Sequence, residues 1–127
     1  MRVLLDTTTL YAAAGVSAVS FTPKVRRLLE DPDTVRLVSP VSFNEIAIKA
    51  NKGLTPLTRE HIRKLISDLA LTVLPLTAEH SLRLFGLPAH HGDPFDRMLI
   101  ATALAEDVAI VASDREFKRY KGVRVIW

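Results

Sequence analysis

Short apolar runs alternate with segments of helical periodicity along the chain. Five runs read as buried strands because they are short and apolar; they span residues 3–5, 35–38, 71–74, 109–112 and 123–126. Strands that alternate with helices in this way form a parallel sheet with right-handed crossovers and helices on both faces. The pattern therefore predicts an α/β fold with a parallel sheet of four to five strands. Ligands of such sheets bind beyond the carboxyl ends of the strands.

The segments between these runs carry helix start and stop signals. Pro23 suits the first turn of a helix, Thr58 suits an N-cap, and Gly53 suits the residue after a helix. The predicted helices span residues 9–14, 23–29, 42–53, 58–69, 78–85, 94–106 and 115–120. The helix at 94–106 is the most apolar of them, so we expect it to be buried on most sides.

Size and composition narrow the possible classes of protein. A chain of 127 residues, 48% of them hydrophobic, can bury one core but not two, which predicts a single domain over residues 1–127. The absence of cysteine excludes a disulfide framework, a thiolate nucleophile and a cysteine zinc site. Asp6 and the threonines after it interrupt the apolar core that a signal peptide needs, and no apolar run is long enough to cross a bilayer. We therefore expect a cytoplasmic protein without a membrane segment.

Acidic residues stand at predicted strand ends and helix starts. Asp6 and Asp114 follow the first and fourth strands, Glu45 lies in the first turn of the helix at 42–53, and Asp93 and Asp96 begin the apolar helix. Carboxylates packed together repel one another unless cations occupy the site. Mg²⁺ and Mn²⁺ take oxygen ligands, and two such ions can promote an in-line displacement at a phosphodiester. If these loops converge, the acids predict a Mg²⁺ or Mn²⁺ site.

Each of these acids also has a purely structural interpretation. The spacing from Ser42 to Glu45 is that of a capping box. The other four could cap a helix or lie in its first turn, where the helix dipole favours negative charge. The joint pattern, and not any single residue, favours a metal site.

Basic residues follow two of the acids. The chain carries a net charge of +3, and Arg115, Lys118 and Arg119 come directly after Asp114, while Lys49 follows Glu45. These four side chains are candidates for contact with nucleic-acid phosphates. They could equally be the solvated face of a terminal helix and an i,i+4 pair with Glu45.

Two histidines precede the apolar helix. An adjacent pair such as His90 and His91 rarely points both rings at one metal ion, and no third histidine lies at the spacing of a zinc site. We expect them to have a loop role or a polar contact beside the site.

Four segments resemble the PIN-domain ribonucleases, and within them the VapC-type toxins of bacterial toxin–antitoxin pairs. They are Leu-Leu-Asp-Thr at 4–7, Ser-Phe-Asn-Glu-Ile-Ala-Ile-Lys at 42–49, His-Gly-Asp-Pro-Phe-Asp-Arg-Met-Leu-Ile-Ala at 91–101 and Ser-Asp-Arg-Glu-Phe at 113–117. The third segment is the most specific, and the set spans essentially the whole chain in order. One departure is the pair Thr8-Thr9, where the relatives carry His-Ala.

The resemblance implies a PIN-like fold and a metal-dependent endoribonuclease. By position, Asp6, Glu45, Asp96 and Asp114 match the acidic quartet of the family, and Asp93 is either a further ligand or the helix cap. Asp6, Asp96 and Asp114 would surround Mg²⁺ or Mn²⁺, with Glu45 orienting water or a second ion. Metal-activated water would cut RNA to leave 5′-phosphate and 3′-hydroxyl ends. The family also implies an inhibitory antitoxin and frequent homodimers.

Other interpretations stay open or fail on particular residues. A phosphatase with an aspartyl nucleophile needs Asp-x-Asp after the first strand, and Thr8 occupies the second position. A phosphoreceiver domain needs an aspartate after the third strand, where Pro75, Leu76 and Thr77 stand. A PIN-like module that binds RNA or protein without cutting remains possible. The helices at 58–69 and 78–85 have apolar stripes that could serve the core or face another chain.

Overall fold

The computed structural model describes residues 1–127 and contains one parallel sheet of five strands in the order β3-β2-β1-β4-β5. The strands are β1 (Arg2–Leu5), β2 (Val35–Val38), β3 (Thr72–Val73), β4 (Ala109–Val111) and β5 (Val125–Ile126). The central strand β1 places Leu4 beside Leu37 of β2 and beside Ile110 of β4. The predicted α/β class with a parallel sheet is confirmed. The edge strands β3 and β5 are shorter than predicted, because each pairs on one side only.

Seven helical segments connect the strands. They are α1 (Thr7–Ala13), α2 (Pro23–Glu30), α3 (Pro40–Asn51), α4 (Arg59–Asp68), α5 (Ala78–Leu82), α6 (Pro94–Glu106) and the 3₁₀-helix η1 (Arg115–Arg119). Helix α1 begins two residues earlier than predicted because Asp6 caps it. Helix α5 ends at Leu82, and the chain continues in turns to Gly86, whose positive φ of 74° suits glycine.

The start of α3 differs from the prediction. Ser39 is the N-cap, its hydroxyl accepts a hydrogen bond from the Val41 N–H at 3.1 Å, and Pro40 occupies the first helical position. The capping box predicted between Ser42 and Glu45 is therefore wrong. Glu45 consequently lies in the second turn of α3 rather than in the first.

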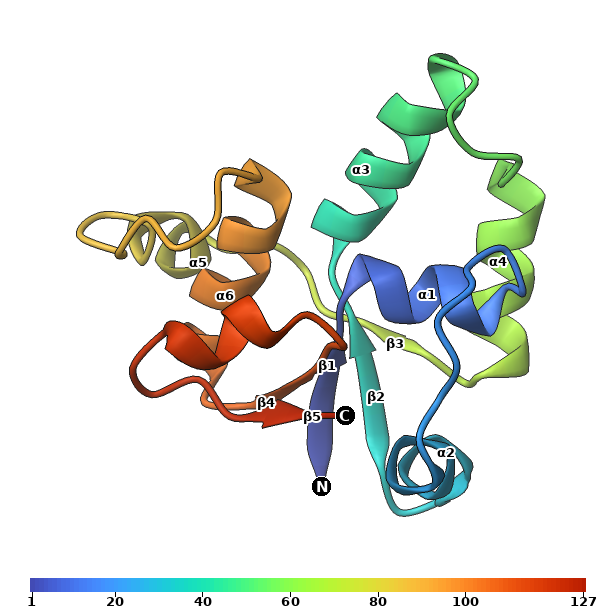
Figure 1. The fold of residues 1–127 in the computed structure, drawn as a ribbon, viewed down its shortest axis with the longest axis horizontal. Helices are drawn as coiled ribbons and strands as arrows, with labels where there is room; N and C mark the ends of the chain where they lie inside the picture. The colour runs from blue at the N-terminus through green and yellow to red at the C-terminus, as the bar shows by residue number, and fades with distance from the viewer.

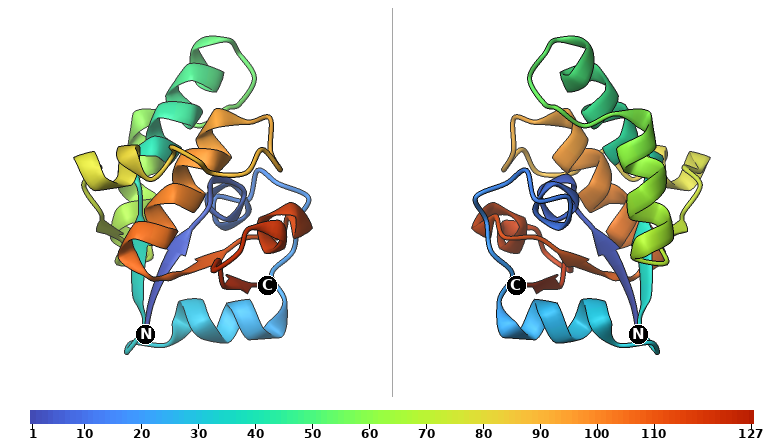
Figure 2. Two further views of the ribbon diagram at one scale, coloured as in Figure 1. Left: turned by 90° about the vertical axis from the view of Figure 1, so that its left-hand side faces the viewer. Right: turned by 90° about the vertical axis from the view of Figure 1, so that its right-hand side faces the viewer.

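Helices cover both faces of the sheet (Figure 1). Val3 and Leu5 of β1 point to the face that packs against α1, α2 and α4, and Leu4 points to the face covered by α6 and η1. Residues 99–103 of α6 are all buried, which confirms that this helix is buried on most sides. Figure 2 shows α2 beneath the amino ends of the strands and α3 beyond their carboxyl ends. No helix is both long enough and apolar enough to cross a bilayer.

Helices α4 and α5 begin with the same unusual capping box. In each, a threonine N-cap is followed three residues later by a histidine whose Nδ1 accepts the threonine N–H: His61 after Thr58, and His80 after Thr77. The two histidines differ in burial, since His61 is exposed and His80 is only 2% exposed. His80 Nε2 also lies 2.6 Å from Glu106 Oε1. His80 therefore ties the start of α5 to the end of α6.

We expect the variant His80→Ala to lose about 3 kcal/mol of unfolding free energy, because it opens a cavity and leaves the Thr77 N–H and Glu106 Oε1 without their partner. The matched control is His61→Ala, which removes the same capping contact at the surface and should lose about 1 kcal/mol. Urea unfolding followed by circular dichroism measures both. Equal losses in the two variants would show that the buried link to Glu106 contributes nothing.

Candidate active site

The carboxyl ends of β1 and β4 lie side by side at the point where the strand order reverses, and such a switch point is where ligands bind in open parallel sheets. Asp6 follows β1 and caps α1, with its Oδ1 accepting the Thr9 N–H at 2.7 Å. Asp114 follows β4 and caps η1, with its Oδ1 accepting the Glu116 N–H at 2.9 Å. The predicted capping roles are confirmed. Each cap uses only one carboxylate oxygen, Oδ1, so the second oxygen of each aspartate faces other groups of the site.

Three further acids come from α3 and from the start of α6. Asp93 caps α6 through its Oδ1, which accepts the Phe95 N–H at 2.8 Å, and Asp96 lies in the first turn. Carboxylate oxygens of Glu45, Asp93 and Asp96 all lie within 4.8 Å of one another. The structure thus brings together residues from two helices that are separated in sequence by β3, α4 and α5.

Glu45 has a cationic partner for only one of its two carboxylate oxygens. Its side chain is only 5% exposed, and Oε2 accepts a hydrogen bond from Lys49 Nζ at 2.6 Å. Its other oxygen, Oε1, is buried with no hydrogen-bond partner. A buried carboxylate oxygen without a partner is costly. A cation ligated there by oxygen atoms would remove that cost.

The carboxylates also influence one another electrostatically. Burial raises the pKa of Asp6 from 3.8 to about 6, against the hydrogen bonds from Thr9, and the charges of Glu45 and Asp114 add to the rise. Burial and the charge of Asp93 raise the pKa of Asp96 to about 7, with further contributions from Glu45 and Asp6. Between them, the shifts in the pKa values of Asp6 and Asp96 involve the charges of all five acids. Such a group is the oxygen-rich donor set that Mg²⁺ or Mn²⁺ prefers.

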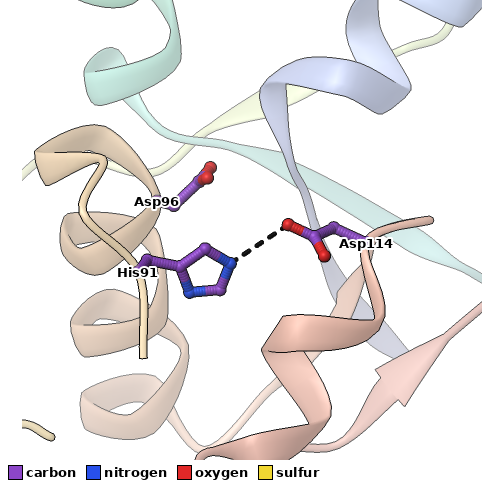
Figure 3. A group of neighbouring side chains, drawn as sticks. All are labelled: His91, Asp96 and Asp114. Carbon is purple, nitrogen blue, oxygen red and sulfur yellow. Dashed lines mark hydrogen bonds and ion pairs between the residues drawn. The ribbon is translucent and has the colours of Figure 1, made fainter. Parts of the chain in front are cut away.

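His91 lies inside this group (Figure 3). Its ring lies beside both Asp96 and Asp114, and its Nε2 is 3.1 Å from Asp114 Oδ2. Ligand atoms of these three residues also lie within 4.8 Å of one another. The expected polar contact beside the site is thus a direct contact with one of the predicted ligands.

Thr9 is a site residue that the sequence prediction did not assign. It is fully buried, and its Oγ1 lies 2.6 Å from Asp6 Oδ1 and 2.9 Å from the carbonyl oxygen of Val111. It therefore joins Asp6 to the end of β4. The signal was present in part, since Thr9 stands three residues after an N-cap aspartate, but the contact with Val111 depends on the sheet.

The four predicted substrate-binding residues differ in whether their charges are already paired within the protein. Lys49 lies beside the carboxylates but is paired with Glu45. On η1, Arg119 is paired with Glu116 at 2.7 Å, whereas the exposed side chains of Arg115 and Lys118 form no ion pair within 4.0 Å. The unpaired positive charge on η1 therefore comes from Arg115 and Lys118.

Solved structures with the same fold are complexes of the VapBC type. A chain of VapBC2 from Rickettsia felis, bound to a DNA fragment from the promoter, superposes with a TM-score of 0.75 at 17% identity and covers 99% of this chain and 98% of its own. DNA-bound VapBC from Salmonella typhimurium superposes with a TM-score of 0.73 at 20% identity, and the match covers 99% of this chain and 97% of the other. VapBC-5 from Mycobacterium tuberculosis superposes with a TM-score of 0.63 at 17% identity, and the match covers 98% of this chain and 97% of the other.

Sequence comparison with curated proteins finds no match. The family model described as "PIN domain", in contrast, matches residues 3–123, a span that contains the whole carboxylate group. The chain therefore belongs to the PIN-domain family.

Proposed function

We propose that the protein is a Mg²⁺- or Mn²⁺-dependent endoribonuclease that acts as the toxin of a toxin–antitoxin pair. The observation that carries the proposal is the convergence of five carboxylates, linked by short distances or by the effect of their charges, together with a buried Glu45 oxygen that has no partner. Membership of the PIN-domain family supports a nuclease, and the VapBC complexes of the same fold support a toxin.

Asp6, Asp96 and Asp114 would hold the ion, and Glu45 would orient water or a second ion. Asp93 retains one oxygen that is not used in capping α6, so it can serve both as cap and as ligand. A bound divalent ion activates water and stabilises negative charge on the phosphate. Lys49 holds the Glu45 carboxylate in place, and Thr9 holds Asp6. The products would be 5′-phosphate and 3′-hydroxyl ends.

A cleavage assay tests this function directly. RNA with single-stranded loops should be cut when Mg²⁺ or Mn²⁺ is present and left intact in excess EDTA, with 5′-phosphate ends on the products. RNA that is bound but never cut with either ion would instead identify a catalytically silent binding module.

The free cations of η1 should contribute to RNA affinity. We expect Lys118→Ala to weaken binding of single-stranded RNA and to flatten its log–log salt dependence by about 0.7, the value for one lost phosphate contact. Arg119→Ala is the matched control, because Arg119 is already paired with Glu116 and should change the slope less. Binding is measured between about 50 and 200 mM salt without divalent ions. An unchanged slope in Lys118→Ala would place the RNA path elsewhere.

A groove between α3 and α4 offers a surface for the proposed antitoxin. It has a volume of about 680 Å³ and is lined by apolar side chains that include Phe43, Ile62 and Ile66, with Arg59 and Arg63 among its polar residues. On α4, Leu65 is buried in the core, while Ile62 and Ile66 pack against that core and also line the groove. Co-purification with the product of the neighbouring gene, and inhibition of cleavage by it, test the partner. Light scattering tests the proposed homodimer.

A further inference from the structure

The hydroxyl group of Tyr120 makes two contacts with a single residue. Tyr120 is 2% exposed, and its hydroxyl oxygen lies 3.0 Å from the main-chain nitrogen of His91 and 3.1 Å from His91 Nδ1. Both groups belong to the segment that leads into α6, whereas Tyr120 is the C-cap of η1. The contact therefore connects two segments that border the carboxylates.

The protons of this contact can be assigned by counting donors and acceptors. A main-chain N–H can only donate, so the His91 N–H donates to the Tyr120 oxygen. The phenol has one proton of its own, and it is directed to the other neighbouring atom, His91 Nδ1. A neutral imidazole that accepts at Nδ1 carries its proton on Nε2. The Nε2–H therefore donates to Asp114 Oδ2 at 3.1 Å.

We propose that Tyr120 and His91 are positioning residues, in which Tyr120 holds the His91 ring with its proton on Nε2 so that the ring anchors Asp114 instead of binding the metal. The inference rests on the proposed function, because it concerns the orientation of a carboxylate that would ligate the ion. It also assigns roles to two residues outside the acidic quartet.

The surroundings explain why Asp114 needs such an anchor. Its side chain is 46% exposed, so burial does not hold it. Its Oδ1 is held by the Glu116 N–H and its Oδ2 by His91, which leaves the carboxylate little freedom to turn. The ring itself is fixed by stacking on Tyr120, with centroids 5.5 Å apart and planes 8° from parallel. It also meets Phe117 edge-on at 4.9 Å.

The competing arrangement makes His91 a ligand through Nε2 together with Asp96 and Asp114. That arrangement needs a lone pair on Nε2 and therefore a proton on Nδ1. The Tyr120 oxygen would then receive two N–H groups, and its own proton would have no acceptor in a buried position. A buried donor without an acceptor costs free energy, so the structure favours the proton on Nε2.

Nitrogen NMR of ¹⁵N-histidine-labelled protein tests the proton's position. At mildly alkaline pH we expect the Nε2–H form of His91, unchanged when Mg²⁺ is added. The variant His91→Gln assigns the signal. A ring protonated on Nδ1, or an Nε2 signal displaced by Mg²⁺ in the manner of a ligating nitrogen, overturns the proposal.

Metal affinity tests the positioning role in the whole protein. Tyr120→Phe keeps the ring but removes the hydroxyl, and it should weaken Mn²⁺ binding by about tenfold, the lower end for a residue that supports a ligand. His91→Ala should weaken it by at least as much, and His91→Gln, which keeps a donor, should recover part of the loss. His61→Gln is the control, because His61 is exposed and lies outside the carboxylate group. Circular dichroism verifies folding.

The outcomes separate this inference from the proposed function. Full Mn²⁺ affinity in Tyr120→Phe overturns the positioning role even if the wild type cuts RNA. A wild type that binds Mn²⁺ but cuts no RNA overturns the nuclease. In that case the Nε2–H form and the weaker Mn²⁺ binding of Tyr120→Phe would still establish that Tyr120 and His91 orient Asp114.

Discussion

Replacing Asp6 by asparagine is expected to abolish metal-dependent RNA cleavage. The substitution removes the negative charge that follows the central strand, and the lost stabilisation of several kcal/mol corresponds to a rate about a thousandfold lower. Asparagine can still accept the Thr9 N–H, so α1 keeps its cap. Initial rates of cleavage with saturating Mn²⁺ measure the effect. A variant that cuts as fast as the wild type would remove Asp6 from the site.

The same substitution should stabilise the protein when metal is absent. The pKa of Asp6 is about 6 in the folded protein and 3.8 ordinarily, so ionisation favours the unfolded state. The wild type therefore loses stability as pH rises from about 4 to about 6, by up to about 3 kcal/mol for a shift of this size. Asp6→Asn lacks this loss. Its advantage should be absent near pH 4 and complete above about pH 6.

Urea unfolding in EDTA at both ends of this range measures the difference. Asp33→Asn is the control, because Asp33 is exposed and away from the carboxylates, and it should leave stability unchanged. Added Mg²⁺ should stabilise the wild type and not Asp6→Asn, since a ligand stabilises only the state that binds it. An Asp6→Asn variant that is less stable than the wild type near pH 8 would contradict the raised pKa.

Metal affinity should depend strongly on pH. The pKa of Asp6 is raised to about 6 and that of Asp96 to about 7, so both acids hold protons in mildly acidic solution. A carboxylate must lose its proton before it ligates a metal ion. Ionisation contributes about tenfold for Asp6 and about a hundredfold for Asp96 over this range, so we expect Mn²⁺ affinity to rise by about a thousandfold between about pH 5 and pH 8, with release of protons. Cleavage should rise in the same direction.

Calorimetry in two buffers of different ionisation enthalpy measures both the affinity and the protons released. The variant Asp96→Asn lacks the group with the higher pKa, so its residual affinity should change less in the upper part of this range. Affinity that is flat from about pH 5 to pH 8 would show that the acids are already ionised in the metal-free protein.

Local features of the fold could be predicted from sequence, because short-range interactions determine them. Asp93 before Pro94 is an N-cap in the structure, and Asp6 and Asp114 cap the helices that follow them. The incorrect start predicted for α3 also arose from interactions between residues close together in the sequence. Ser39 with Pro40 and Ser42 with Glu45 are both plausible starts, and Ser42 is instead buried, where its Oγ accepts the Thr7 hydroxyl.

The long-range contacts of the site could not be predicted in the same way. Thr9 reaches Val111, 102 residues away, only because β1 and β4 pair side by side. His91 reaches Asp114 because a loop and η1 meet beyond those strands. The order of residues in the sequence was enough to place the acids at strand ends and helix starts. It could not predict that one oxygen of Glu45 is buried without a partner, or that the hydroxyl of Tyr120 contacts His91. Those depend on which side chains are buried together.

The central place of β1 in the sheet also determines when this site can form during synthesis. The first strand leaves the ribosome early, but its neighbour on one side is β4, more than a hundred residues later. A sheet closed by such distant pairings forms slowly and late, because the intervening loop must be ordered first. The carboxyl groups of Asp6 and Asp114 therefore meet only after residue 114 has emerged. Under the proposed nuclease function, a nascent chain could not yet cut the messenger RNA from which it is being translated.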